Sequence, residues 1–149
     1  SEFGSSPSLY EGQIAFVNSN ELYFWDGTSS MLISDSLLIQ WGDPSLYNNE
    51  IAFEAHDGND FEIFLWNGLE IIQITNNDFD DKNPSLYDGQ IAWDGELGEN
   101  WTSTEIFFWD GANVFQLTSN SISDSNPSLY NGDIAWRSGF SGYSKRNIR

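Results

Sequence analysis

The segment Pro84-Ser85-Leu86-Tyr87-Asp88-Gly89-Gln90-Ile91-Ala92-Trp93 decides the fold, because its pattern occurs four times in 149 residues. Each copy has Pro-Ser-Leu-Tyr, a turn, and then Ile-Ala followed by Phe or Trp. The copies begin at Pro7, Pro44, Pro84 and Pro127, which are 37, 40 and 43 residues apart. A period near forty residues indicates a repeat architecture in which each unit is one supersecondary structure.

Each complete unit contains four short apolar segments separated by turn residues. In the third unit these are Pro84–Tyr87, Gln90–Trp93, Glu105–Trp109 and Val114–Thr118. The segments are rich in β-branched and aromatic residues, and pairs such as Asp-Gly and Asn-Gly between them are typical of hairpins. The third segments are apolar on both faces, as in a sheet that is covered on two sides. We therefore predict an all-β protein of four-stranded antiparallel sheets, stacked like the blades of a β-propeller.

The unit from Asp81 to Pro127 also carries a family resemblance. It reads Asp-x-Asn-Pro-Ser-Leu-Tyr-x-Gly-x-Ile-Ala-Trp, then Glu-Ile-Phe-x-Trp-Asp-Gly, then Gln-Leu-Thr. This pattern resembles the blades of TolB-like and WD-repeat-like β-propellers, and the resemblance covers residues 7–136. It implies a ring of six or seven blades. It implies little about function, since propellers host many unrelated activities.

The repeats divide the chain into about 3.5 blades. Residues 1–6 match no other unit and are interpreted as a cloning remnant. The expected units are blade 1 at 7–43, blade 2 at 44–83, blade 3 at 84–126, a partial blade 4 at 127–136, and a basic tail at 137–149. Such a stack leaves apolar faces and strand edges open. Either the chain is a fragment of a longer propeller, or copies of it associate. We favour a homodimer that completes the ring.

The charge of the chain is strongly negative and unevenly distributed. There are 23 acidic and five basic residues, giving a formal charge of −18, and every acidic residue precedes Arg137. This charge disfavours nucleic acid and anionic membranes as partners. The chain has no cysteine, so disulfides and thiolate metal sites are excluded. The basic tail of one copy is expected to rest on the acidic surface of a neighbouring copy. High salt should then loosen the assembly.

One connection varies in length far more than the others. From the second segment to the third it spans 5 residues (Phe16 to Glu21), then 9 (Phe53 to Glu62), then 12 (Trp93 to Glu105). Variable loops on a rigid scaffold are where binding usually resides, although simple drift would give the same pattern. The candidate ligand-binding residues on these loops are His56, Asp57, Asp60, Glu96, Glu99 and Trp101.

The sequence predicts no catalytic, cofactor-binding or metal-binding residue. His56 is the single histidine, which gives a weak basis for a catalytic triad. The acidic loop 76–81 is interpreted as a solvated turn rather than a calcium loop.

The favoured interpretation is a non-enzymatic binding or scaffold module that self-associates. One alternative is a carbohydrate-binding, lectin-like propeller that uses loop aromatics, so that its ligand would be a glycan rather than a protein. Further alternatives are a hydrolase with loop carboxylates and an engineered or selected propeller fragment.

Overall fold

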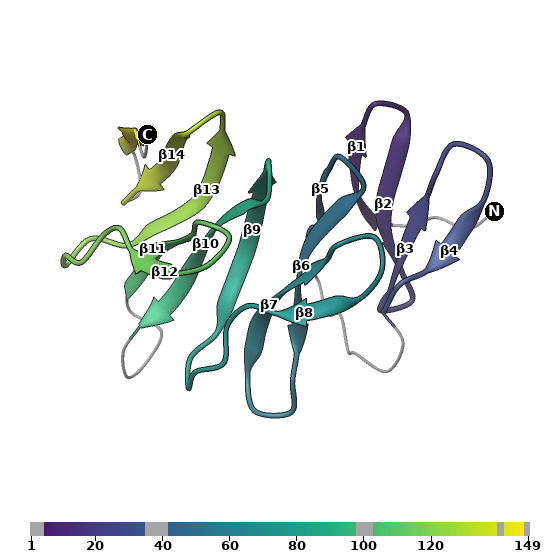
Figure 1. Ribbon diagram of the computed structural model, residues 1–149. Helices are drawn as coiled ribbons and strands as arrows, with labels where there is room; N and C mark the ends of the chain where they lie inside the picture. The colour runs from purple at the N-terminus through teal and green to yellow at the C-terminus, as the bar shows by residue number, and fades with distance from the viewer. Residues whose placement is uncertain (1–4, 35–41, 98–102, 140–141, 148–149) are drawn as a thin grey trace.

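The computed structural model describes residues 5–34, 42–97, 103–139 and 142–147, which form four antiparallel sheets (Figure 1). Blade 1 contains β1 (Ser5–Tyr10), β2 (Gln13–Asn18), β3 (Glu21–Trp25) and β4 (Ser30–Leu32). Blade 2 contains β5 (Ser45–Tyr47), β6 (Glu50–His56), β7 (Phe61–Trp66) and β8 (Ile71–Gln73). Blade 3 contains β9 (Asp81–Tyr87), β10 (Gln90–Leu97), β11 (Ser103–Trp109) and β12 (Val114–Gln116). Blade 4 contains β13 (Asp124–Tyr130), β14 (Asp133–Ser138) and β15 (Gly142–Asn147). Strands follow one another in chain order within each sheet, so the predicted all-β blade architecture is confirmed.

The first two strands of each blade are joined by a two-residue turn. Both turn residues have positive φ in all four blades, for example 49° at Asp88 and 71° at Gly89. Two consecutive residues with positive φ make the type I′ turn, whose twist matches that of the flanking strands. The hairpins predicted from the turn residues are therefore confirmed.

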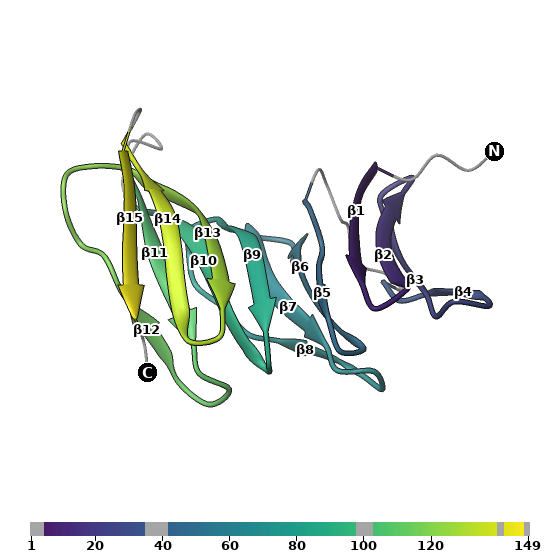
Figure 2. The same cartoon turned by 90° about the horizontal axis from the view of Figure 1, so that it is seen from above.

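The hydrophobic core is divided into three clusters, each between two neighbouring blades. Phe24 and Trp66 lie in the cluster between blades 1 and 2, Trp93 between blades 2 and 3, and Trp136 between blades 3 and 4. Figures 1 and 2 show the four sheets side by side in chain order, with the two termini at opposite ends. A blade in the middle of the row is thus covered on both faces, whereas each end blade is covered on one.

The Pro-Ser-Leu-Tyr motif makes a repeated contact between neighbouring blades. The serine hydroxyl of one blade accepts the backbone N–H of the leucine in the next, at 3.0 Å, 2.9 Å and 2.9 Å. The pairs are Ser8–Leu46, Ser45–Leu86 and Ser85–Leu129. The tyrosine rings form a continuous row with centroids 4.6 Å, 4.6 Å and 4.8 Å apart, through Tyr10, Tyr47, Tyr87 and Tyr130. The repeated motif is therefore the junction between blades as well as their first strand.

Buried carboxylates make a second repeated contact between blades. Glu54 Oε2 accepts the backbone N–H of Asn83 at 2.7 Å, and Asp94 Oδ1 accepts that of Asn126 at 3.0 Å. Burial raises the pKa of Glu54 to about 7 and that of Asp94 to about 6. Asp81, which accepts from the indole N–H of Trp93 at 2.9 Å, has its pKa raised to about 7 by burial.

Blade 4 has one more strand than the repeat pattern predicted. Residues 142–147, within the segment interpreted as a basic tail, pair with β14 over their whole length, from Gly142 opposite Ser138 to Asn147 opposite Asp133. This strand lies at a sheet edge, so its sequence needs no apolar face. At the other end β1 begins at Ser5, within the segment interpreted as a cloning remnant. Among the described residues no helix is long and apolar enough to span a membrane.

Candidate functional site

The open face of blade 1, here called the leading face, exposes side chains that are buried in the other blades. Leu9 is 71% exposed, whereas its counterparts Leu46, Leu86 and Leu129 are 6%, 5% and 5% exposed. Ile14 and Phe16, the other two members of the leading face, are also more exposed than Ile51 and Phe53 in blade 2. In the other blades, these positions pack against the preceding blade. The leading face therefore exposes positions that are buried at the junctions between the other blades.

The open face of blade 4, here called the trailing face, shows the complementary pattern. It comprises Ser128, Tyr130 and Ala135. Tyr130 is 68% exposed, and Ala135 is exposed although the equivalent alanines of blades 1 to 3 are fully buried. Ser128 is exposed at the position where Ser85 accepts the N–H of Leu129. In the other blades, these positions pack against the following blade.

A cluster of three acidic side chains is formed by Asp57 and Asp60 of the β6–β7 turn and Glu62 of β7. One carboxylate oxygen from each lies within 4.8 Å of the others. Glu62 is fully buried, and its Oε1 accepts the backbone N–H of Asn77 at 2.6 Å while Oε2 accepts from the hydroxyl of Thr75. Asp57 is exposed and accepts the backbone N–H of Asn59 at 2.9 Å through Oδ1. Asp60 is 8% exposed, and both of its buried oxygens lack a hydrogen-bond partner among the described residues.

Burial is the main electrostatic influence on this cluster. It raises the pKa of Asp60, the negative charge of Asp57 raises it further, and the side-chain amide of Asn59 acts in the opposite direction. Burial also raises the pKa of Glu62, although the hydrogen bonds from Thr75 and Asn77 act in the opposite direction. The cluster therefore combines negative charge with an incomplete set of hydrogen bonds.

A salt-bridge network connects this turn to blade 3. Asp80 Oδ1 accepts the backbone N–H of Phe61 at 3.0 Å. The ammonium group of Lys82 lies 2.8 Å from Asp80 Oδ2 and 3.2 Å from Glu96 Oε1. The β6–β7 turn thus meets the connection into blade 3 and strand β10 at the boundary between blades 2 and 3.

The structure brings some of the predicted ligand-binding residues together and places others differently. Asp57 and Asp60 lie in the acidic cluster, and Glu96 is joined to the nearby Asp80 through Lys82. Glu96 belongs to β10 rather than to a loop, because this strand continues to Leu97 and pairs Glu96 with Thr104. His56 ends β6, and its Nδ1 accepts the backbone N–H of Gly58 at 3.0 Å. Glu99 and Trp101 lie outside the described residues.

Sequence reasoning missed the roles of Glu62, Asp80 and Lys82. Glu62 was identified only as the first residue of a third strand, and its position two residues after Asp60 was the signal that would have indicated a cluster. Alternate residues of a strand project to the same face, so Asp60 and Glu62 can share one surface at the start of β7. Asp80 lies in the connection between blades 2 and 3 and Lys82 at the start of β9, and only the fold shows that they approach the β6–β7 turn.

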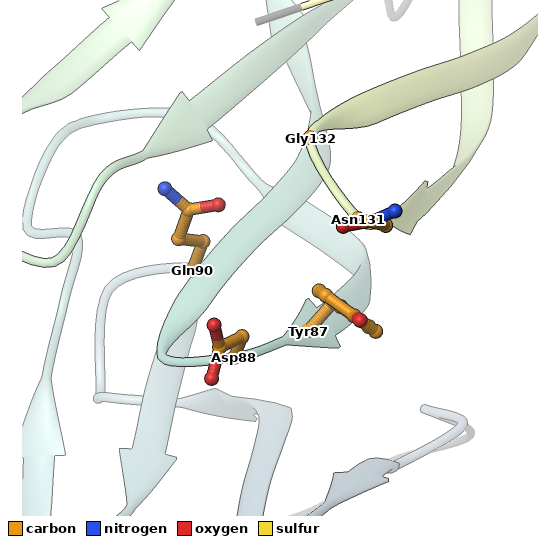
Figure 3. A pocket seen from close by; sticks show the side chains of 5 residues that line it. All are labelled: Tyr87, Asp88, Gln90, Asn131 and Gly132. Atoms are coloured by element: carbon orange, nitrogen blue, oxygen red, sulfur yellow. The ribbon is translucent and has the colours of Figure 1, made fainter. Parts of the chain in front are cut away.

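A pocket lies at the opposite end of the blades, where the type I′ turns are located. It is lined by Tyr87, Asp88, Gln90, Asn131 and Gly132 (Figure 3). Figure 3 shows these residues on the adjacent β9–β10 and β13–β14 turns. The pocket is the space between two neighbouring turns beside the tyrosine row, and its lining offers no pair of groups suited to acid–base chemistry.

Comparison with solved structures agrees with the propeller fold. The chain superposes on the β-propeller domain of the Trilobed protease from Pyrococcus furiosus with a TM-score of 0.71 and 10% identity, over 97% of this chain and 51% of that domain. It superposes on the computationally designed Ika4 protein with a TM-score of 0.67 and 10% identity, over 99% of this chain and 92% of Ika4. It also superposes on TolB from Acinetobacter baumannii with a TM-score of 0.69 and 20% identity, over 99% of this chain and 41% of TolB.

At these identities the likeness concerns the fold alone. The chain spans about half the length of the Pyrococcus furiosus propeller domain. No family model matches the sequence, and no curated protein does. The blade architecture is thus that of β-propellers such as TolB and the propeller domains of peptidases.

Proposed function

We propose that this chain is a non-enzymatic β-propeller module, a binding or scaffold unit, that associates with a second copy to close its ring. The observation that carries the proposal is the complementarity of the two open faces. At the three internal junctions a serine hydroxyl accepts a leucine N–H of the following blade. The trailing face offers Ser128 as the next acceptor, and the leading face offers Leu9 as the next donor.

The tyrosine row and the apolar surface support the same arrangement. Tyr130 on one copy would stack on Tyr10 of the other, which extends the row across the new junction. Leu9 and Tyr130 are both more than two-thirds exposed, and burying such surface is favourable by about 25 cal/mol per Å². Two copies related by a two-fold axis form two identical junctions, each between a leading and a trailing face. Because the structure has four sheets, the dimer would contain eight, whereas the sequence resemblance implied six or seven.

The contacts of His56 support a non-enzymatic role. Its Nδ1 accepts a backbone N–H, and its ring lies edge-on to Phe61 with centroids 5.2 Å apart. These contacts stabilise the turn, and among the described residues no hydrogen bond joins the imidazole to a hydroxyl that could act as the nucleophile of a triad. The likeness to Ika4 supports the proposal that one chain of this length forms a module, since a computationally designed chain of nearly this length adopts the same fold.

The decisive experiment is a molecular mass measured by light scattering after size-exclusion chromatography, at micromolar concentration. We expect twice the 16.9 kDa mass of the chain. Leu9→Lys and Ala135→Lys, at opposite ends, should each shift the protein towards monomer, because each places a charge in an apolar junction. Leu69→Lys is the matched control, since Leu69 is 94% exposed in the β7–β8 turn and belongs to neither face.

Mixing the two variants distinguishes the proposed arrangement from a symmetric contact between like faces. In a leading-to-trailing dimer, the mixture has one junction made from two unmodified faces, so dimer should reappear. A wild-type monomer would contradict the proposal. So would a dimer that one of the two substitutions leaves intact.

A further inference from the structure

We propose that Asp57, Asp60 and Glu62 bind a calcium ion at the β6–β7 turn of blade 2. The three side chains place one carboxylate oxygen each within 4.8 Å of the others. This spacing allows a single ion to contact all three, since calcium binds six to eight oxygens at about 2.3–2.6 Å. Water and the second carboxylate oxygens would complete the coordination.

The unpartnered carboxylate of Asp60 is the independent observation that points to a ligand. Its side chain is more than nine-tenths buried, and neither oxygen has a partner of good hydrogen-bond geometry among the described residues, although the side-chain amide of Asn59 lies close enough to lower its pKa. A buried carboxylate without a donor or a cation is strongly unfavourable. Asp57 and Glu62, both acidic, flank it. A cation between the three groups would remove the repulsion and supply the missing interaction at once.

The surrounding contacts hold the ligands in place without occupying the site. Thr75 and Asn77 fix the carboxylate of Glu62, and Asn59 and Gln73 donate to that of Asp57, at 2.9 Å and 3.4 Å. The nearby cation, Lys82, forms salt bridges with Asp80 and Glu96. Oxygen is the only donor type in the cluster, which favours a hard cation over zinc or copper. The flexible ligand number and the exposed position of Asp57 suit calcium better than magnesium, which demands near-octahedral geometry.

The other blades provide an internal comparison. Glu62 has counterparts in Glu21 and Glu105, but the position of Asp60 is occupied by Ser19 in blade 1 and Ser103 in blade 3. The acidic cluster is therefore a feature of blade 2 and not a requirement of the blade fold.

The test is isothermal titration calorimetry of the whole chain with calcium chloride, in physiological salt so that diffuse attraction to the acidic surface is screened. We expect one saturable site per chain with a dissociation constant of about 10⁻⁴ M or tighter, and weaker binding of magnesium. Asp60→Asn, which is isosteric, and Asp60→Ser, which copies blades 1 and 3, should weaken binding at least about tenfold, as expected when one charged ligand is removed. Glu70→Gln removes the same charge from an exposed position and should bind calcium like the wild type.

Thermal unfolding gives a second readout that does not depend on calorimetric heats. Calcium should raise the midpoint of the wild type and of Glu70→Gln relative to EDTA, and raise that of Asp60→Asn by clearly less. In EDTA, Asp60→Asn should melt at or above the wild-type temperature, because it removes an uncompensated buried charge. The proposal is overturned if the wild type shows no saturable calcium site, or if Asp60→Asn binds as tightly as the wild type. It is also overturned if Glu70→Gln weakens binding equally.

Discussion

Glu54 shows how a single buried carboxyl group makes the stability of the fold depend on pH. It is 6% exposed, and its pKa rises from 4.5 to about 7 in the folded chain. The folded state therefore binds a proton more tightly than the unfolded state does. Unfolding releases this proton between pH 4.5 and about 7, so stability falls as the pH rises through that window. Asp81 and Asp94 act in the same direction.

We predict that Glu54→Gln reduces the loss of stability between pH 5 and pH 8. Glutamine keeps an oxygen that can accept the N–H of Asn83 but has no proton to lose. The change in the free energy of unfolding across this range should shrink by up to about 3 kcal/mol. Urea unfolding at a series of pH values measures it, with the exposed Glu70→Gln as the control for net charge. An unchanged pH profile in Glu54→Gln would show that this carboxyl group titrates normally.

At the scale of the elements, blades 1 to 3 each contribute one serine acceptor to the blade that follows. Ser85 accepts the backbone N–H of Leu129 at 2.9 Å, so Ser85→Ala leaves a buried donor without a partner. We predict a loss of about 1–2 kcal/mol in the free energy of unfolding. Ser128→Ala is the matched substitution at the open trailing face. It should leave the unfolding of dilute monomer unchanged and raise the dissociation constant of the dimer.

Urea unfolding at low protein concentration and analytical ultracentrifugation separate these two effects. Equal destabilisation of the monomer by Ser85→Ala and Ser128→Ala would contradict the assigned hydrogen-bond partners. No effect of Ser128→Ala on the dimer would show that the junction between copies differs from the internal ones.

The strands and hairpin turns could be predicted from the sequence because their residues carry local preferences. Pairs such as Asp88-Gly89 adopt positive φ readily, and the apolar segments between them repeat in register. β15 could not be predicted, since an edge strand such as residues 142–147 carries no repeated apolar pattern. The role of Ser85 was also hidden, because its partner lies 44 residues away in the next blade.

The candidate site could be predicted only in part, because some of its residues act through contacts that form only in the folded chain. Variation in loop length identified Asp57 and Asp60, which belong to the β6–β7 turn. Glu62 and Asp80 were not recognised, because their roles depend on where a strand begins and on how close the neighbouring connection comes. The sequence predicts a loop at Glu96, but β10 continues to Leu97, so Glu96 lies in a strand.

At the scale of the whole molecule, net charge opposes the association that the open faces favour. Each chain carries a formal charge of −18, so closing a dimer brings two strongly negative bodies together. Two of the basic residues near the C-terminus make contacts within their own chain, which limits their use in offsetting this repulsion. Lys145 lies 2.8 Å from Asp133 and Arg146 donates to the carbonyl of Leu117 at 3.3 Å, so both are engaged within their own chain.

We therefore predict that salt strengthens the dimer, in contrast to the loosening expected from a basic tail resting on an acidic neighbour. Screening shortens the range of the repulsion from about 30 Å at 0.01 M salt to about 8 Å at 0.15 M, while the apolar junction is little affected. The dissociation constant should fall by about three- to tenfold over that range, equivalent to about 1 kcal/mol. Sedimentation equilibrium at several sodium chloride concentrations measures it, with Leu69→Lys as a variant whose lower net charge should reduce the dependence. A dissociation constant that rises with salt would show that complementary charges across the junction, rather than Leu9, Tyr130 and their apolar neighbours, hold the two copies together.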